Sequence, residues 1–156
     1  MASVASVLIE SRPLTDAELG TLLLAQQREL AEAHGGADDV AYAVRDAASY
    51  LVAVVDGRAV ACGAWQPLEP GAAELKRMFV RPAYRGRGIA RQLVVALEEE
   101  ALAAGRPTLR LETGTYLPAA IALYRSCGYA EIPPYGEYAG NPFSVCLEKR
   151  LAVSAQ

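Results

Sequence analysis

The sequence predicts an α+β domain built on a mixed, mostly antiparallel central sheet of about seven strands, with a central parallel βαβ unit and helices on both faces. Two β-rich runs, 50–55 and 59–65, flank Asp56-Gly57, a strong hairpin signal. The apolar run 73–80 is followed by an arginine- and glycine-rich turn, a long amphipathic helix and a further short strand. A strand entered from such a helix is expected to run parallel to the one before it.

The other elements follow from hydrophobic periodicity and turn residues. Thr15 and Glu18 have the spacing of a capping box and are expected to start the first helix, which Gly35-Gly36 ends. The expected strands are 4–10, 50–55, 59–65, 73–80, 108–112, 129–132 and 143–147, and the expected helices are 15–33, 38–48, 89–104 and 118–126.

The helix 89–104 has a clear apolar face, so one side of it is expected to pack on the sheet. The acidic run 98–100 is expected to lie mostly on its wet side. The residues expected on the inner face are Ile89, Leu93, Ala96, Leu97 and Leu102.

Composition indicates one domain over residues 1–156, with 53% hydrophobic residues and no linker or repeat. A net charge of −3 and a pI near 5.2 speak against nucleic acid as a partner. The cysteines are odd in number and far apart in sequence, and they form no metal-ligand pair: Cys62, Cys127 and Cys146. This pattern is typical of reduced thiols in a cytoplasmic protein. No signal peptide or membrane-spanning run is visible, so no membrane association is expected.

Basic residues are concentrated where the 73–80 strand meets the following helix. Positions 76–91 hold six Lys and Arg and no acid, although the whole chain has 15 basic and 18 acidic residues. A helix N-terminus presents unpaired amides, and Gly86 and Gly88 let a ligand approach them. This stretch is therefore predicted to hold a phosphate-bearing ligand.

A dinucleotide fold fits this stretch poorly. Gly86-x-Gly88 begins the glycine fingerprint and Glu112 could supply the acid, but Arg91 stands where the third glycine belongs. Five residues, 81–85, also separate the strand end at Val80 from Gly86, and no Gly-Lys-Ser/Thr of a P-loop is present. A nicotinamide cofactor is therefore not expected.

Two motifs resemble the GNAT superfamily of N-acetyltransferases. Arg85-x-x-Gly88-x-Ala90 is similar to its Arg/Gln-x-x-Gly-x-Gly/Ala signature, and the stretch 120–129, with Tyr124 before Gly128-Tyr129, resembles its second motif. The order of predicted elements agrees with the same acyl-CoA N-acyltransferase-like fold.

The resemblance implies acetyl-CoA as co-substrate. Backbone amides of 86–90 would hold its pyrophosphate, and the edge of the 73–80 strand would pair with the pantetheine arm. That pairing requires the two parallel strands to splay apart near Val80, which a β-bulge produces in this family. The implied cofactor residues are Met78, Phe79, Val80, Arg85, Gly86, Arg87, Gly88, Ile89, Ala90 and Arg91; solvated surface charge is the alternative for the arginines.

Acetyl transfer to an amine needs a base that takes a proton from the ammonium, directly or through water, and an acid for the leaving thiolate. Glu74 matches the family's position for the base, with a salt bridge to Lys76 or Arg77 as the structural alternative; Glu112 is the second candidate. Tyr124 is the candidate acid. Where the family often has an asparagine that contacts the cofactor, this chain has Leu117. His34, the only histidine, is expected to be a surface residue at a helix end.

The acceptor is expected to contact the connections 35–39 and 133–141. Tyr135, Glu137 and Tyr138 would form an aromatic wall with one acid, suited to a small-molecule amine. Alternatively, the prolines of the second connection make a rigid turn against a partner subunit in a homodimer. Trp65 is expected in the core. The predicted function is N-acetylation of a primary amine from acetyl-CoA; the alternative is a non-catalytic acyl-CoA-binding domain on the same fold.

Overall fold

The structure, a computed structural model, describes residues 6–33 and 48–152. The strands are β1 (Val7–Arg12), β2 (Ser49–Val55), β3 (Arg58–Pro67), β4 (Ala72–Val80), β5 (Thr108–Gly114), β6 (Ala130–Ile132) and β7 (Ser144–Arg150). The helices are α1 (Ala17–Ala33), α2 (Ile89–Ala103) and α3 (Pro118–Ser126), and the 3₁₀ turns η1 and η2 cover Pro82–Tyr84 and Gly136–Tyr138.

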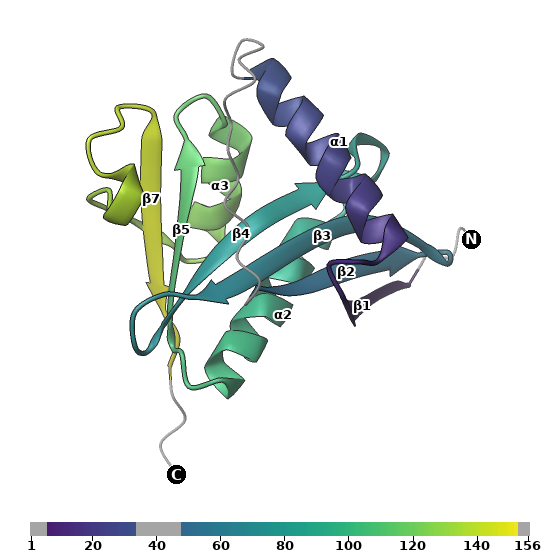
Figure 1. The fold of residues 1–156 in the computed structure, drawn as a ribbon, viewed down its shortest axis with the longest axis horizontal. Helices are drawn as coiled ribbons and strands as arrows, with labels where there is room; N and C mark the ends of the chain where they lie inside the picture. The colour runs from purple at the N-terminus through teal and green to yellow at the C-terminus, as the bar shows by residue number, and fades with distance from the viewer. Residues whose placement is uncertain (1–5, 34–47, 153–156) are drawn as a thin grey trace.

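The seven strands form one sheet in the order β1-β2-β3-β4-β5-β7-β6. β4 and β5 are parallel, and the other neighbouring strands are antiparallel. Because α2 links β4 to β5, the predicted βαβ unit lies at the centre of the sheet (Figure 1). The predicted α+β class and mixed sheet are confirmed.

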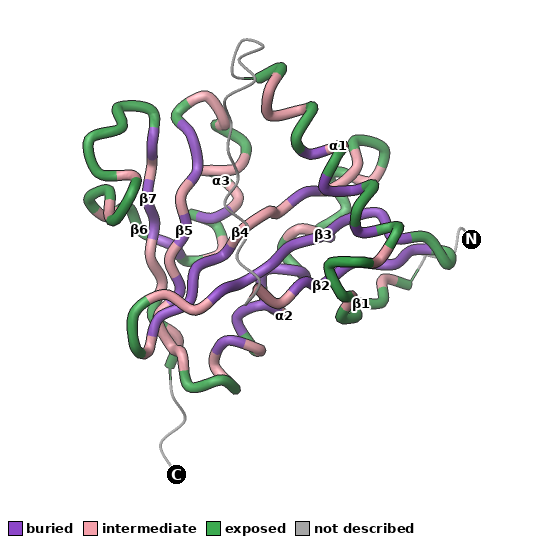
Figure 2. Tube along the Cα trace, viewed as in Figure 1, coloured by how far each residue is buried: buried purple, intermediate pink, exposed green. Residues whose placement is uncertain are grey.

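Each face of the sheet carries its own apolar cluster, and buried residues run along the central strands (Figure 2). On one face, Leu19 and Leu22 of α1 pack with Phe79 of β4. On the other, Leu93 and Leu97 of α2 join a cluster that also takes in α3. Successive strand residues point to opposite faces, so the two clusters are separated by the sheet, and helices cover both sides as predicted.

The β2–β3 hairpin is confirmed in detail. Asp56 has φ 49° and Gly57 has φ 77°, and two central residues with positive φ are what a type I′ turn requires. Trp65 on β3 is 9% exposed and belongs to the apolar cluster of α2, as predicted for a core residue.

β4 carries a β-bulge opposite Gly63. Its register with β3 shifts between Cys62 and Ala64, and Arg77 takes φ 60°, which is uncommon for a residue other than glycine. A Cβ on Gly63 would overlap the Met78 sulfur, so a larger residue there would have to displace the Met78 side chain.

β4 and β5 begin side by side and then diverge (Figure 1). Their pairing runs from Ala72 with Thr108 to Glu74 with Arg110, and no later pair occurs between them in the described ranges. The rest of β4, up to Val80, therefore presents an edge toward the gap. The predicted bulge and splay are both confirmed.

The start of α1 differs from the predicted capping box. The helix begins at Ala17, and Asp16 is its cap, because Asp16 Oδ2 accepts the Leu19 N–H at 2.9 Å. Glu18 instead accepts the Ala59 N–H at 2.9 Å. The Thr15–Glu18 prediction was wrong because a backbone amide at the start of β3 binds the Glu18 carboxylate.

The buried face of α2 also differs from the predicted one. Val94 and Ala101 are buried, whereas Ala96 and Leu102 are half-buried. Glu98, expected on the wet side, is 6% exposed, so that prediction was wrong. A pairing explains its burial, since the carboxylate accepts the Tyr129 hydroxyl at 2.8 Å and lies 3.1 Å from Lys149 Nζ.

Some predictions fall outside the described residues. These are the helix at 38–48, of which only residue 48 is described, the acceptor connection 35–39 and the surface placement of His34, and they stay predictions.

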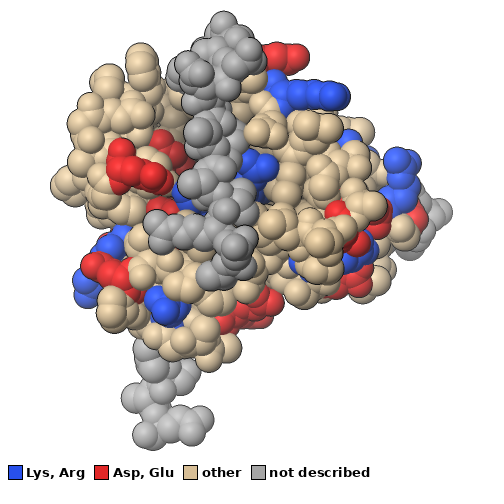
Figure 3. Space-filling view, viewed as in Figure 1, with Lys and Arg blue, Asp and Glu red and all other residues tan. Residues whose placement is uncertain are grey.

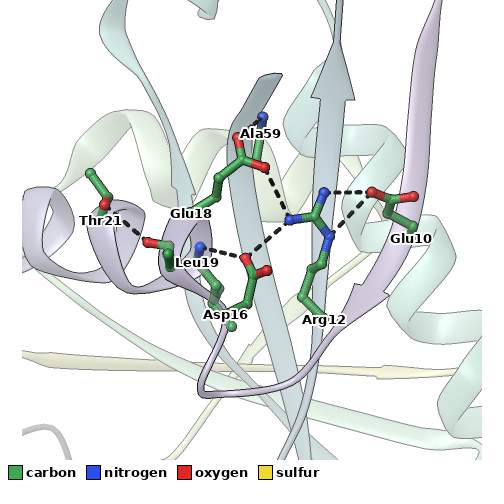
Figure 4. Close-up of polar contacts among 8 residues, drawn as sticks. Glu10, Arg12, Asp16, Glu18, Leu19, Thr21 and Ala59 are labelled. Atoms are coloured by element: carbon green, nitrogen blue, oxygen red, sulfur yellow. Dashed lines mark hydrogen bonds and ion pairs between the residues drawn. The ribbon is translucent and has the colours of Figure 1, made fainter. Parts of the chain in front are cut away.

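Arg12 joins the end of β1 to the start of α1 (Figure 4). Its guanidinium donates to Glu10 at 2.6 Å, Asp16 at 3.0 Å and Glu18 at 3.1 Å. The pKa of Asp16 is lowered, first by the Leu19 amide and then by Arg12. The pKa of Glu18 is lowered first by the Ala59 amide and then by Arg12.

The Arg12→Met variant is expected to unfold about 2–4 °C below wild type at neutral pH, a shift typical of one lost surface network in a domain of this size. A lowered carboxylate pKa stabilises the fold above the ordinary carboxylate pKa of about 4 and loses its effect as pH falls through the folded-state value. The difference between the two proteins should therefore shrink in acid. Thermal melts at several pH values measure it, with the exposed Arg28→Met on α1 as control. A difference in melting temperature that stays constant down to acid pH would contradict the stabilising role of the Arg12 ion pairs.

Candidate active site

Glu74 lies where β4 and β5 separate. It is the last β4 residue paired with β5, opposite Arg110, and is 3% exposed. Its neighbours Ala73 and Leu75 belong to the apolar cluster of α2, so the Glu74 side chain lies on the face covered by α1. A buried carboxylate at the base of the gap is a candidate acid–base group.

Both carboxylate oxygens of Glu74 have partners. Oε1 accepts Gln66 Nε2 at 3.1 Å and lies 3.1 Å from Lys76 Nζ. Oε2 accepts the Tyr135 hydroxyl at 2.5 Å. The Lys76 salt bridge considered from the sequence is thus present, together with a hydrogen bond from the 133–141 connection that the sequence did not indicate.

The connection 133–141 lies against β4 and β5 through its tyrosines. Lys76 Nζ donates to the Tyr138 hydroxyl at 2.7 Å and lies 5.4 Å from the centre of that ring. Arg110 lies 5.9 Å from the Tyr135 ring, and the two tyrosine rings meet edge to face at 5.5 Å. The cation-binding faces of both rings thus already contact cations of the protein. Glu137 is exposed beside them.

Glu112 on β5 is a second carboxylate of this site. It is half-buried, and Ser144 Oγ donates to its Oε2 at 2.7 Å. Burial raises the pKa of Glu112, and the charges of Glu74 and Glu137 raise it further, while the Ser144 hydrogen bond and the Lys76 charge oppose the shift. Because Glu112 lies across the gap from β4, it remains the alternative candidate for the general base.

Tyr124 lies on α3, is 7% exposed, and meets Tyr129 edge to face at 6.0 Å. Burial raises the pKa of its phenol, so the hydroxyl is protonated at neutral pH. The hydroxyl makes no hydrogen bond to any residue in the described ranges. Leu117, at the N-cap of α3, supplies no side-chain hydrogen bond there.

The glycine-rich turn opens directly onto α2. Gly86 and Gly88 both have φ 78°, a left-handed conformation that favours glycine. Gly88 is the N-cap of α2, and no side chain caps this helix start in the described part of the chain. The first-turn amides of α2 are thus available to an anion, and the phosphate site at this turn stays a prediction. Ile89, 2% exposed, anchors the turn in the core.

Arg85 connects this turn to α1. Its guanidinium donates to both Glu29 oxygens at 2.7 Å, and its Nε donates to the Val80 carbonyl at 2.8 Å. It also lies 5.7 Å from the Phe79 ring. The Val80 carbonyl, expected to pair with the pantetheine arm, therefore already has one donor, and a carbonyl can accept a second.

Arg87 and Arg91 also contact the protein. Arg87 lies 5.1 Å from the Tyr84 ring, whereas Arg91 donates to Ser126 Oγ at 2.6 Å and so ties α2 to the end of α3. Their charges remain close to the turn, and both side chains are exposed.

Gln26 of α1 was missed from the sequence. It is 5% exposed, and its Nε2 donates to the Met78 carbonyl in the bulge at 2.9 Å, while its buried Oε1 has no hydrogen-bond partner within the described ranges. A polar residue continuing the buried 19, 22, 23 face of α1 was the available signal. Gln26 holds α1 against the distorted segment of β4.

Gly88→Ala tests the turn. Forcing a β-carbon into a left-handed conformation costs about 1–2 kcal/mol, so the dissociation constant for CoA is expected to rise about 5- to 30-fold as the amides rotate. Isothermal calorimetry with CoA measures the effect. Gly105→Ala is the matched control, because Gly105 has φ 79° at the other end of α2. Equal affinities for Gly88→Ala and wild type would rule out the turn as the phosphate site.

On the face drawn in Figure 3, acidic and basic side chains of the described residues are interspersed. Among the residues that the structure describes, no helix has both the length and the apolar character needed to cross a bilayer. No group of three His, Cys, Asp or Glu in the same ranges is arranged to hold a metal ion.

Comparison with known proteins supports the fold and the motifs. The model of the Acetyltransferase (GNAT) family matches residues 17–129. An IAA acetyltransferase of Azospirillum brasilense is 48% identical over 103 residues, which cover 65% of this chain and 67% of that protein. The uncharacterized N-acetyltransferase YjgM of Escherichia coli is 37% identical over 87 residues, covering 54% of this chain and 52% of its own length.

Solved structures of related proteins share the fold of this chain. A Klebsiella pneumoniae protein described as an acyl-CoA N-acyltransferase is 35% identical, covers 94% of this chain and 98% of its own, and superposes with a TM-score of 0.79. A Bacillus subtilis acetyltransferase in complex with CoA shares the fold at a TM-score of 0.71 and 19% identity, covering 94% of this chain and 100% of its own. The chain therefore belongs to the GNAT family and is an acyltransferase with acetyl-CoA as its co-substrate.

Proposed function

We propose that this chain transfers the acetyl group of acetyl-CoA to the primary amine of a small molecule, with Glu74 as general base and Tyr124 as general acid. The observation that carries the proposal is the buried Glu74 carboxylate at the point where β4 and β5 part. The pantetheine arm would enter that gap and pair with the edge of β4 from Met78 to Val80, while the pyrophosphate would bind the turn at 86–90.

The reaction loses two protons from the acceptor nitrogen. Glu74 takes the first, which frees the lone pair to attack the acetyl carbonyl carbon, and a backbone amide around Val80 would stabilise the oxyanion. When the C–S bond breaks, Tyr124 protonates the sulfur, and the second proton of the nitrogen restores the phenol through solvent. The buried Tyr124 phenol suits this role because its raised pKa keeps the proton in place until sulfur leaves.

Tyr135, Glu137 and Tyr138 are proposed to line the acceptor side. Because Lys76 and Arg110 already contact the two rings, the acceptor ammonium would approach the exposed Glu137 carboxylate and the Tyr135 hydroxyl rather than enter an empty aromatic cage. Such a surface favours a compact amine over a basic protein tail, since it offers few acids.

The test is thiol release from acetyl-CoA together with mass detection of the acetylated product, across alkylamines, polyamines, amino acids and short peptides. IAA is added because the Azospirillum relative is named for it. Acetylation of at least one primary amine is expected. Thiol release without any acetylated amine would refute the proposal.

Comparing Glu74→Gln with Glu112→Gln decides between the two candidate bases. A larger fall in kcat for Glu74→Gln is expected, because Glu112 lies outside the hydrogen-bond network that joins Glu74 to Tyr135. The reverse order of effects would assign the base to Glu112.

A further inference from the structure

The burial of Glu74 raises a question about how an acceptor reaches it. The residue is 3% exposed, Oε1 is occupied by Gln66 and Lys76, and Oε2 is occupied by the Tyr135 hydroxyl. A general base must come within hydrogen-bond reach of the proton that it removes, directly or through one intervening group. Because so little of Glu74 is exposed, its hydrogen-bond partners among the described residues offer the shortest route for the proton.

Only one of these partners can carry a proton. Gln66 is 4% exposed and offers Glu74 an amide N–H, which neither gains nor loses a proton at neutral pH. The Lys76 ammonium has donors but no lone pair, and it is already bound to Tyr138. The Tyr135 hydroxyl both donates and accepts, and it belongs to a half-buried residue between exposed Pro134 and Gly136.

We propose that Tyr135 relays the proton from the acceptor ammonium to Glu74, an inference that rests on the proposed acetyl transfer. The ammonium nitrogen gives a proton to the Tyr135 oxygen while the Tyr135 proton passes to Glu74 Oε2. The nitrogen keeps the electron pair of its broken N–H bond and attacks the acetyl carbon. Glu74 ends protonated and the phenol ends unchanged, so charge and protons balance.

The surroundings of Tyr135 require the two proton transfers to be concerted. Burial, then the hydrogen bond to Glu74 and the Glu74 charge, raise the pKa of the Tyr135 phenol, and Tyr138 and Cys146 raise it further. Two cations also face this pair: Lys76 on β4 lies beside the Glu74 carboxylate, and Arg110 on β5 lies over the Tyr135 ring. A free phenolate does not persist there, so Tyr135 can accept one proton only as it gives up the other.

Tyr135→Phe removes the hydroxyl and keeps the ring that contacts Tyr138 and Arg110. The variant is assayed with the best alkylamine of the panel and with the same amine fluorinated next to the nitrogen, which is neutral at the assay pH. With the alkylamine, kcat is expected to fall about 10- to 100-fold, at the low end of general-base effects. With the fluorinated amine, which has no ammonium proton to lose, the fall should be less than about threefold. Comparing two acceptors on one variant cancels any loss of folded protein.

Glu74→Gln and Tyr50→Phe accompany this measurement. Glu74→Gln should show the same selective loss, whereas Tyr50→Phe removes a buried hydroxyl that makes no hydrogen bond to the described residues and should show none. If Glu74→Gln is slow with the alkylamine and Tyr135→Phe is as fast as wild type, the Tyr135 relay is overturned, while Glu74 remains the general base. An equal loss on both amines in Tyr135→Phe also overturns the relay. If wild type acetylates no amine, the proposed function fails, and the relay fails with it.

Discussion

The Tyr124→Phe variant is expected to lose about 10²-fold or more in kcat, the range of general acid catalysis, while its dissociation constant for CoA stays within about twofold. The reason is that the hydroxyl makes no hydrogen bond to a described residue, so replacing it leaves the hydrogen bonds of the fold and of the phosphate turn in place. In the proposed mechanism its proton is needed only when the thiolate leaves. An interaction used only in the transition state lowers kcat and kcat/KM together.

The measurement is steady-state kinetics with the best amine of the panel, combined with calorimetry for CoA. Tyr50→Phe is the control, because it also deletes one buried hydroxyl, which has no hydrogen-bond partner among the described residues, and it should match wild type in rate and stability. Unchanged kcat in Tyr124→Phe, or equal losses of rate and CoA affinity, would remove Tyr124 from the acid role.

The Glu98→Leu variant is expected to lose about 3 kcal/mol of unfolding free energy, a value typical of breaking a buried ion pair. The Glu98 carboxylate accepts hydrogen bonds from the Tyr129 hydroxyl and from Lys149 Nζ. Lys149 Nζ also donates to the Cys127 carbonyl at 2.8 Å. The side chains of Glu98 and Lys149 are 8% and 27% exposed, so removing the carboxylate leaves a largely buried cation unpaired.

Urea unfolding measures this loss. The neighbouring exposed Glu99→Gln is the control and should change stability by no more than about 0.5 kcal/mol. Adding Lys149→Met and Tyr129→Phe to Glu98→Leu should recover much of the loss, because the unpaired cation and hydroxyl are then gone and only the Cys127 carbonyl loses its side-chain donor. A Glu98→Leu protein as stable as wild type would mean that the contacts add nothing to the fold.

The fold was predictable because its strongest local signals agree with one another. The Asp56-Gly57 turn, the apolar run that ends at Val80 and the glycine turn before α2 each specify one element and its direction. Periodicity misplaced Glu98, since a pattern of charges cannot show that Lys149 and Tyr129, distant in sequence, will meet it. The cap at Asp16 was missed for the same reason, because the Ala59 amide of β3 binds Glu18.

The candidate site was predictable only in part. Motif position selected Glu74 and Tyr124, and the aromatic connection supplied Tyr135 and Tyr138 as acceptor contacts. Sequence gave no sign that the Tyr135 hydroxyl reaches the Glu74 carboxylate, because η2 folds the connection back onto β4 through contacts 61 residues apart. Partners separated by such distances along the chain depend on tertiary packing rather than on any local pattern.

The central claim is that the donor lies between β4 and β5 with its sulfur at Tyr124 and its acetyl group toward Glu74. A crystal structure of the protein with acetyl-CoA bound tests it most directly. The account predicts density for the pantetheine arm along β4 from Met78 to Val80, with the sulfur within about 3.5 Å of the Tyr124 hydroxyl. An arm outside the gap, or a sulfur beyond hydrogen-bond reach of Tyr124, would contradict it.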